Sequence, residues 1–444
     1  MTTIVAQETK KRKPHIGVQL RLFEHSRFAG LCTLFETWRL WNGSSLFEGL
    51  GGKRGKDAEG LALAYVCRGP IGAQTQTGLS EALANDELFE HYVPLRISQW
   101  DFSRFLDWFG DRALLFWCGV IRKAQVTKQL RRTITGIWVI DDTILEKTGK
   151  RIANVRKLYD HAKQQFVYGI SYVQLLSVDR GQRYPLFFGI HSKRGRKPTK
   201  QRDRVAPIGK LKIALRLITQ ALDCGCRPRA VVFDAWYAAT CLLRALRRLR
   251  LPFVSRLNSA RTLLIDGRKV KAKALCSTIG CARYYRRLKV RAFALMAILP
   301  KYGPVQVVVF KQRRKSPVIV MTDLLDADLT AVIELYRQRW SIETWFKEIK
   351  QRYGLDKFQH RSAARILAHI VLILLSYLLV TLLQQLAPAV RTCKSKELFV
   401  RVIRIVAVVS VVDSVLNIIV GSSHHLFQRT VLRFNGLQMI PSTV

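Results

Sequence analysis

The chain has 444 residues, of which 49% are hydrophobic, and its 74 Lys and Arg against 31 Asp and Glu give a formal net charge of +43. This length fits about two to four structural units, and this hydrophobic content excludes a chain that is disordered throughout. So large a positive charge is costly in self-repulsion unless a polyanion neutralises it. Nucleic acid, whose phosphates also release counterions on binding, is therefore the first partner that we expect.

The nine cysteines are spread thinly and include two close pairs, Cys224 with Cys226 and Cys276 with Cys281. No C-x2-C pair recurs and no histidine pair accompanies them, so the pattern does not favour a zinc site. We expect reduced thiols, as in a cytoplasmic protein.

One stretch of 18 residues without a charge, 366–383, is long enough to cross a bilayer. Polar residues interrupt it, and it directly follows a charged helical region. We therefore expect a buried core helix and no association with a membrane.

The first part of the chain predicts helices. Residues 1–15 are polar and basic, and we expect them to be disordered. From 16 to 130, aromatic residues and leucines recur at spacings of three and four, which is the period of helices with one buried face. We interpret this part as a helical DNA-binding region.

A β-rich section follows from about residue 133. Its hydrophobic runs predict strands, and two stretches of helical period lie before the last two of them. In chain order we expect strands at 134–143, 166–178 and 182–190, a helix at 207–223, a strand at 229–237, a helix at 237–249 and a strand at 251–257. This β-β-β-α-β-α-β order is that of an RNase H-like α/β fold, in which crossover helices cover the sheet.

Short alternating runs rich in Arg and Lys then predict a β-rich insertion at 258–322, after which helices resume. The stretch 336–350 reads YRQRWSIETWFKEIK, contains neither Pro nor Gly, and predicts one helix. At about 100° per residue, one side of this helix gathers the side chains of Tyr336, Arg339, Glu343 and Lys350. Such a mixture of charges is found on solvated, ion-paired faces as well as in functional sites.

Three acidic residues lie where they could meet. Asp141 ends the first predicted strand, Asp234 ends the fourth, and Glu343 lies on the later helix. In a fold of this order the first and fourth strands are neighbours, and a helix returning across the sheet adds the third carboxylate. Two Mg²⁺ ions, for which Mn²⁺ could substitute, would balance these charges and promote phosphoryl transfer. Asp142 remains an alternative to Asp141 as the first ligand.

The motifs around these residues resemble those of a known family. The spacing in 336–350 matches the Y-x2-R-x3-E-x6-K signature of a large group of bacterial insertion-sequence transposases of the DDE superfamily. IDDT at 140–143 resembles the first motif of this group, and alignment on its threonine selects Asp141. VVFDAWY, which contains Asp234 and Tyr237, resembles the second motif. The intervals of 93 and 109 residues between the acidic residues leave room for the β-strand insertion of this group.

The resemblance, which covers about 131–386, implies a cut-and-paste DNA transposase. Such an enzyme is a magnesium-dependent endonuclease that cleaves the ends of a mobile element and transfers their 3′-OH groups into target DNA. The resemblance assigns catalysis and metal binding to Asp141, Asp234 and Glu343, and DNA binding to Tyr336, Arg339 and Lys350. It implies terminal inverted repeats and target DNA as partners, a homodimer on DNA, and a place in the bacterial cytoplasm with the nucleoid.

We therefore predict six regions. In order they are a disordered basic tail at 1–15, a helical DNA-binding region at 16–130 that recognises the inverted repeats, the first part of an RNase H-like core at 131–257, a β-rich insertion at 258–322, the second part of the core with the catalytic helix at 323–386, and a helical C-terminal region at 387–444 that is a candidate for dimer contacts.

Overall fold

A computed structural model of the chain describes the following residues, apart from the side chains of 32, 33, 36 and 383–386: 32–48, 50, 57–68, 73, 75–84, 96–127, 130, 136–160, 162–179, 181–191 and 209–386. The tail predicted at 1–15 and the region predicted at 387–444 lie outside these residues. By its internal contacts the chain divides into two units, residues 1–105 with 379–444 and residues 106–378.

The described part of the first unit is helical. It contains α2 (Cys32–Leu40), α3 (Ser45–Glu48), α4 (Ala58–Val66), α6 (Gln76–Ala84) and the first turns of α8 (Gln99–Gly110). Aromatic side chains form its core, with the ring of Tyr65 packed edge-on against that of Phe102 at 5.7 Å. Buried Arg68 satisfies the Tyr65 hydroxyl by donating to it at 2.8 Å. This unit therefore has a packed interior of its own, as the spacing of its aromatic residues predicts.

The second unit is built on one 12-stranded sheet, with the order β2-β3-β1-β5-β6-β12-β11-β10-β7-β8, to which β4 adds beside β3 and β9 beside β10. The strands are β1 (Ile137–Glu146), β2 (Arg156–Asp160), β3 (Gln165–Asp179), β4 (Gln182–His191), β5 (Val231–Phe233), β6 (Phe253–Arg256), β7 (Thr262–Ile265), β8 (Arg268–Lys271), β9 (Tyr284–Tyr285), β10 (Val290–Leu299), β11 (Gly303–Gln312) and β12 (Val318–Thr322).

Five of these strands form an RNase H-like core. β3 pairs antiparallel with both β4 and β1, while β1, β5 and β6 run parallel. The parallel strands are connected through α10 (Lys210–Asp223) and α11 (Thr240–Arg248), as parallel pairing requires. The predicted fold class is therefore confirmed, and the predicted element order is correct apart from the additional strand β2.

The strands of the predicted insertion continue the core sheet. β12 pairs antiparallel with β6, in a register that places Thr322 beside Val254, and β11 and β10 follow outward. The 3-10 helix Ala272–Cys281 lies between β8 and β9. Residues 258–322 are thus mainly β-structure, and hydrogen bonds join them to the core.

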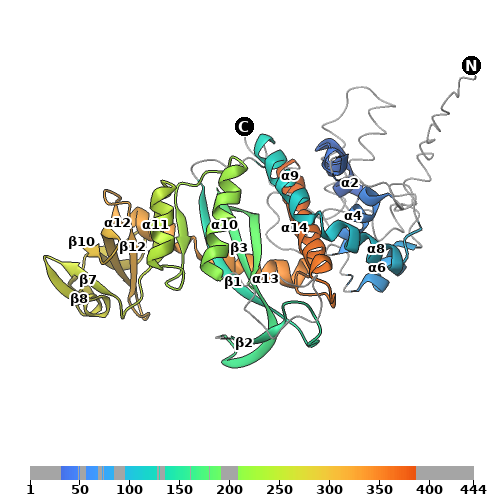
Figure 1. Ribbon diagram of the computed structural model, residues 1–444. Coiled ribbons are helices and arrows are strands. Elements are labelled where there is room, and N and C mark those ends of the chain that lie inside the picture. Colours follow the sequence, from blue (N-terminus) through green and yellow to red (C-terminus); the bar gives the residue numbers. More distant parts are fainter. Residues whose placement is uncertain are drawn as a thin grey trace, which may run out of the picture. The chain divides into compact units, whose positions relative to one another are not determined.

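Helices cover both faces of the core strands, with α10 in front of the sheet and α13 (Trp340–Tyr353) behind it in Figure 1. Successive residues of β1 demonstrate the two faces, because Asp142 bonds Lys210 of α10 whereas Thr143 bonds Lys350 of α13. α10 packs closely enough that a Cβ atom at Gly189 of β4 would lie 2.5 Å from the Ile213 side chain. Both layers are therefore fixed by direct contact with the sheet.

The prediction of one helix at 336–350 is wrong. α12 (Leu329–Arg337) ends before Gln338, and α13 begins at Trp340. Between them the i→i−3 pattern replaces the α-helical one, since the amides of Arg339 and Ser341 bond the carbonyls three residues earlier at 3.0 and 2.9 Å. Tyr336 consequently belongs to α12, and Arg339 directly precedes α13. No Pro or Gly marks this turn, so the sequence pattern gives no sign of it.

The apolar stretch forms most of α14 (Ala363–Leu386). Among the described helices, its part Ala363–Leu382 is long and apolar enough to cross a membrane, but most of it is buried within the protein. Tyr377 packs against Trp345 and Tyr353 of α13, with ring centroids 6.1 and 5.4 Å apart. The expected role as a core helix therefore agrees with its contacts.

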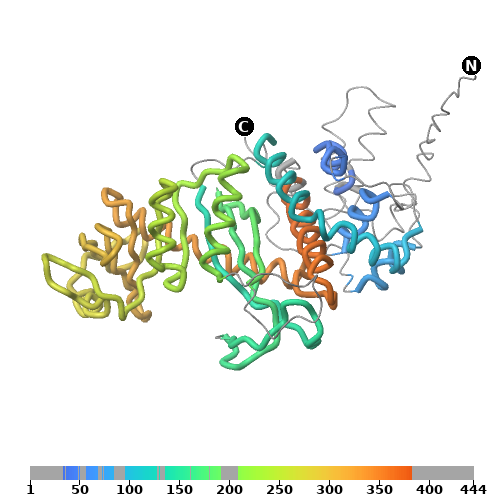
Figure 2. The backbone as a smooth tube through the Cα atoms, in the orientation of Figure 1, coloured from blue at the N-terminus to red at the C-terminus, as the bar shows by residue number. Residues whose placement is uncertain are grey.

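One helix of the region predicted at 16–130 belongs to the second unit. This helix, α9 (Ala113–Val126), has a buried apolar side, and its Trp117 indole donates a 2.5 Å hydrogen bond to the Leu186 carbonyl of β4. The tracing in Figure 2 shows α9 next to α14. Just before α9, Gly110 at the end of α8 lies so close to α14 that a Cβ atom there would collide with the carbonyl oxygen of Ala364. α9 is thus part of the packing of the RNase H-like core.

Candidate active site

Two of the predicted acidic residues lie side by side on parallel strands. The register of β1 and β5 pairs Ile140 with Phe233, so Asp141 and Asp234 are the next residues on neighbouring strands. Asp234 follows the last residue of β5, and its carboxylate accepts the amides of Trp236 and Tyr237 at 3.0 and 3.2 Å. That turn fixes the Asp234 side chain beside β1.

The two carboxylates are close enough to affect one another. The pKa of Asp141 is raised to about 7, mainly by burial and after it by the negative charges of Asp234 and Asp142. The amide of Asp142, which donates to Asp141 at 2.8 Å, and the guanidinium of Arg339 only partly offset these effects. A carboxyl group with so high a pKa has a strong preference for an added positive charge.

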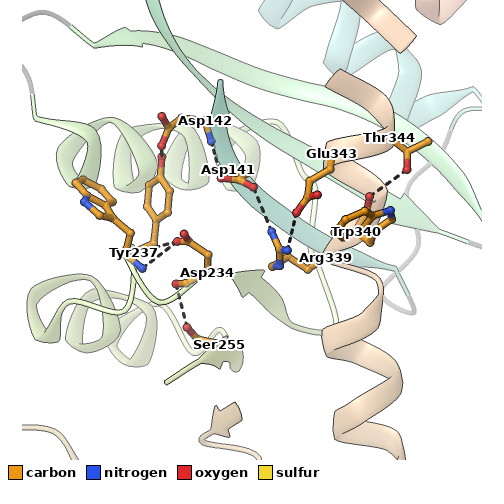
Figure 3. Close-up of polar contacts among 10 residues, drawn as sticks. Asp141, Asp142, Asp234, Tyr237, Ser255, Arg339, Trp340, Glu343 and Thr344 are labelled. Carbon is orange, nitrogen blue, oxygen red and sulfur yellow. Dashed lines mark hydrogen bonds and ion pairs between the residues drawn. The ribbon is translucent and has the colours of Figure 1, made fainter. Parts of the chain in front are cut away.

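The third predicted acidic residue approaches from α13. Arg339 lies between Asp141 and Glu343, donating to the first at 3.4 Å and to the second at 2.6 Å (Figure 3). β1, β5 and α13 thus bring Asp141, Asp234 and Glu343 into one cluster. Among the described residues no three Asp, Glu, His or Cys side chains lie as close together as a single metal ion requires. In this cluster the guanidinium of Arg339 lies between the carboxylates of Asp141 and Glu343, where a metal ion would otherwise lie.

Asp142 has different partners from Asp141. Its carboxylate accepts a 2.6 Å bond from Lys210 and a 3.0 Å bond from the Tyr237 hydroxyl. Successive residues of a strand point to opposite faces, so Asp142 is directed toward α10 and Asp141 toward Arg339 at the start of α13. Burial, and after it the Asp142 charge, raises the pKa of Tyr237 far above its ordinary value, which keeps its hydroxyl a donor.

The other two residues of the helical signature lie apart from each other. Lys350 donates to the Thr143 hydroxyl at 2.7 Å and to the Ile144 carbonyl at 2.8 Å, which ties α13 to β1. Burial lowers the pKa of Lys350. Tyr336 is half-buried and packs edge-on against Phe310 of β11 at 6.3 Å. Arg339 and Lys350 are therefore held at β1, and Tyr336 is held at the inserted strands.

Three further residues border the acidic cluster and were not singled out from the sequence. Trp236 and Trp340 are 54% and 63% exposed, one next to the Asp234 turn and the other next to Arg339. The Lys210 ammonium lies 5.1 Å from the Trp236 ring centre. The sequence alone does not identify these tryptophans as site residues, because a tryptophan is more often part of a core. Their exposure beside a charged cluster, which only the structure gives, indicates their role.

The fold and the cluster together define the class of protein. An RNase H-like sheet with aspartates on adjoining parallel strands and a glutamate on a covering helix is typical of enzymes that act on phosphodiesters with divalent metals. The model of the family described as "Transposase DDE domain" matches residues 134–379, which is more than half of the chain. The chain therefore belongs to this family and is a transposase of the DDE superfamily. Among curated proteins, no match was found.

Membership of this family establishes the general activity. Its members are nucleases that carry out transposition, bind DNA and generally use divalent metal ions. It also indicates a soluble, cytoplasmic protein that acts on DNA. The match contains all six residues that were predicted as site residues, and its beginning at residue 134 lies just before β1.

Proposed function

We propose that this protein is a cut-and-paste DNA transposase that cleaves the ends of an insertion sequence and joins their 3′-OH groups to target DNA. In this proposal Asp141, Asp234 and Glu343 are the catalytic residues. The observation that supports it most is the convergence of three carboxylates from β1, β5 and α13, two of them bridged by Arg339.

The chemistry of these residues fits magnesium. Carboxylate oxygens are hard donors of the kind that Mg²⁺ takes, and the pKa of Asp141 is raised first by burial and then by the negative charges of its neighbours, both of which a bound cation would offset. We propose that Asp141, Asp234 and Glu343 hold two Mg²⁺ ions, with Mn²⁺ as a substitute. When bound, such ions activate a water or a 3′-hydroxyl and stabilise the leaving oxygen.

Arg339 has two tasks in this proposal. Two of its guanidinium nitrogens bond Asp141 and Glu343, which orients the glutamate toward the strand that carries the first aspartate. A guanidinium has five N–H donors, so the same group can also bind a phosphate oxygen of the DNA strand. An Arg that contacts both carboxylates and DNA would be displaced from the carboxylates when metal and substrate arrive.

Lys350 and Tyr336 are the other proposed DNA contacts. The Lys350 ammonium already bonds Thr143 and Ile144, so it positions α13 against β1, and one further donor remains for a phosphate. The Tyr336 ring is half-buried and packs against Phe310. We therefore propose that its hydroxyl group contacts the phosphate backbone of the DNA. Asp142 is not a metal ligand in this proposal, because Lys210 and Tyr237 bind it.

The remaining assignments concern partners and regions. We propose that the helical N-terminal region recognises terminal inverted repeats and that the protein acts as a homodimer on DNA, near the nucleoid and without a membrane anchor. We retain the six regions and their boundaries at 15, 130, 257, 322 and 386 as part of the proposal, with α9 as the part of the second region that packs on the core. A net charge of +43 supports a long DNA footprint, since every neutralised phosphate adds to affinity.

The deciding experiment uses purified protein and DNA that flanks its reading frame. With Mg²⁺ the wild type should cleave at the element ends and join the ends to a target plasmid, whereas Glu343→Gln should bind the same DNA and cleave at least about 10³-fold more slowly. EDTA should abolish cleavage by the wild type. Cleavage without joining would point to a nuclease of the same fold, and full activity of Glu343→Gln would reject the triad.

A further inference from the structure

A hairpin formed by the unpredicted strand β2 and the first residues of β3 extends from the sheet beyond β1. β2 pairs with the first residues of β3, in a register that places Lys157 beside Tyr168 and Tyr159 beside Phe166. Residues two apart on a strand share a face, so these four side chains form one two-by-two array. We call this array the hairpin ladder. In Figures 1 and 2 the hairpin protrudes from the rest of the sheet.

The ladder presents aromatic rings to solvent. Phe166 is 63% exposed, Tyr168 40% and Tyr159 39%, and the Tyr159 and Phe166 rings meet edge-on at 5.2 Å. The other side of β2, with Arg156 and Leu158, is half-buried. Single exposed apolar residues are common on protein surfaces and need no explanation. Several large ones gathered on one face, in contrast, usually mark an interaction site.

Lysines accompany the rings. The Lys157 ammonium lies 5.0 Å from the centre of the Phe166 ring, and that of Lys150 lies 5.2 Å from the centre of the Tyr168 ring. From Glu146 to Tyr168 the sequence has six Lys or Arg and two Asp or Glu. The surface is thus aromatic and positively charged at once, which favours a polyanion with exposed ring systems.

The ladder faces the same side of the sheet as the catalytic cluster. The register between β1 and β3 pairs Asp141 with Gln174, and Tyr168 is six residues before Gln174 on the same strand, hence on the same face. The shift in the β3–β4 register occurs later, between Leu175 and Leu176. At about 3.3 Å per residue, Tyr168 is roughly 20 Å along the strand from the position of Asp141.

We propose that the hairpin ladder binds unpaired bases of single-stranded DNA, by stacking them on Tyr159, Phe166 and Tyr168 while the lysines bind the backbone. In duplex DNA the base faces are already stacked, so only an unpaired strand offers them to the rings. This inference rests on the proposed function, because cleavage at an element end would produce an unpaired strand near the catalytic carboxylates. The ladder lies about 20 Å from them, within reach of such a strand.

The hairpin packs closely at its base and on the side opposite the ladder. A Cβ atom at Gly169 would lie 2.6 Å from the Ile144 side chain and 2.7 Å from the Leu145 carbonyl oxygen, so β3 lies very close to β1 at the base of the hairpin. Behind the ladder, Arg156 Nη2 lies 2.5 Å from His191 Nδ1 of β4. Rings fixed in this way lose little conformational entropy when a base stacks on them.

The test measures DNA binding by the full-length protein in EDTA, so that cleavage plays no part. The probes are a fluorescein-labelled (dT)20 strand and a labelled 20-base-pair duplex, followed by fluorescence anisotropy. The triple variant Tyr159→Ala, Phe166→Ala, Tyr168→Ala should bind (dT)20 at least about tenfold more weakly and the duplex less than about twofold more weakly. Phe166→Trp should retain the affinity, and Tyr284→Ala, which removes an aromatic that is 54% exposed elsewhere on the sheet, should have no effect.

A second readout distinguishes stacking from charge. 2-Aminopurine placed in the (dT)20 strand should lose fluorescence on binding to the wild type and should not lose it with the triple variant. Unchanged affinity of the triple variant for (dT)20, or an equal loss for both DNAs, would overturn the inference while leaving the proposed transposase activity intact. A shift in the sedimentation of the DNA-free protein caused by the triple variant would assign the ladder to a second copy and also overturn it. A wild type that binds neither DNA would overturn the proposed function as well.

Discussion

Arg339 and Glu343 form a 2.6 Å ion pair across the first turn of α13, and the guanidinium is 18% exposed against 36% for the glutamate. The pair has the i,i+4 spacing that also occurs on ordinary helix surfaces. Its setting is different, because the same guanidinium reaches Asp141 on β1. Arg339 therefore connects Glu343, on α13, to Asp141 on β1.

This arrangement predicts opposite effects of one substitution on metal binding and on activity. In Arg339→Ala the carboxylates of Asp141 and Glu343 lose a competing cation, so metal-free protein should bind Mn²⁺ about two- to fivefold more tightly, which matches about 0.5–1 kcal/mol for a partly exposed ion pair. Cleavage of end DNA should nevertheless fall about 10²-fold, because a positioned donor to the phosphate is lost. Calorimetric titration with Mn²⁺ and a cleavage assay measure the two effects.

Arg352→Ala serves as the control, because Arg352 is an exposed cation on the same helix. It should change neither the Mn²⁺ affinity nor the cleavage rate by more than about twofold. Weaker binding of Mn²⁺ by Arg339→Ala would contradict this prediction, because it would mean that the guanidinium helps metal binding more by orienting Glu343 than it hinders it by competing with the cation.

The raised pKa of Asp141 predicts how stability depends on pH without metal. The carboxyl keeps its proton in the folded protein up to about pH 7, whereas in the unfolded chain it loses it near pH 4. The folded state thus binds more protons between these values, so stability should fall as pH rises from 4 to 7, by no more than about 4 kcal/mol. In Asp141→Asn this component should be absent. Urea unfolding in EDTA at pH 4.5, 6 and 7.5 compares the two proteins.

Divalent metal should reverse the effect. A cation held by the deprotonated carboxylates stabilises the folded state by mass action, so Mg²⁺ at pH 7.5 should raise the melting temperature of the wild type and not that of Asp141→Asn. A pH profile that is the same in both proteins would show that Asp141 is not the group with the raised pKa.

Much of this site was predictable because it follows from the chain's local pattern. Asp141 and Asp234 directly follow apolar strand residues, and adjacency of the first and fourth strands comes with the fold. Glu343 was proposed from the family signature, in which one helical turn brings it together with Arg339. The sequence also predicted the long apolar helix that packs behind α13.

The remaining features depend on contacts between distant residues. The Asp142–Lys210 pair joins residues 68 apart in the sequence, and nothing near Asp142 reveals which face it takes. The β2 segment RKLYD is short, half polar and without a clear alternation, so it does not stand out as a strand. The turn between α12 and α13 has helix-forming residues throughout, and only tertiary contacts of Tyr336 and Arg339 distinguish it.

Asp142 should be important for stability and not for metal binding. In Asp142→Asn the partly buried Lys210, 22% exposed, loses its charged partner, and the Tyr237 hydroxyl keeps only a neutral one. We expect a loss of about 1–3 kcal/mol in unfolding free energy with an unchanged Mn²⁺ affinity. Glu146→Gln, which breaks the exposed pair with Lys163, should leave the urea midpoint of unfolding nearly unchanged. Loss of Mn²⁺ binding in Asp142→Asn alone would reassign the first ligand.

The base of the hairpin predicts a strong effect of one methyl group. In Gly169→Ala the new Cβ would meet the Ile144 side chain at 2.6 Å and the Leu145 carbonyl oxygen at 2.7 Å, and a strand backbone cannot move aside as a flexible side chain can. We expect a loss of about 1–3 kcal/mol in unfolding free energy, measured by urea denaturation. Gly209→Ala is the matched control, because nothing lies within 4 Å of its Cβ position and its φ of −67° suits any residue. If the two variants unfold at the same urea concentration, β3 can separate from β1 at Gly169, and the hairpin ladder does not hold its rings at a fixed distance from Asp141.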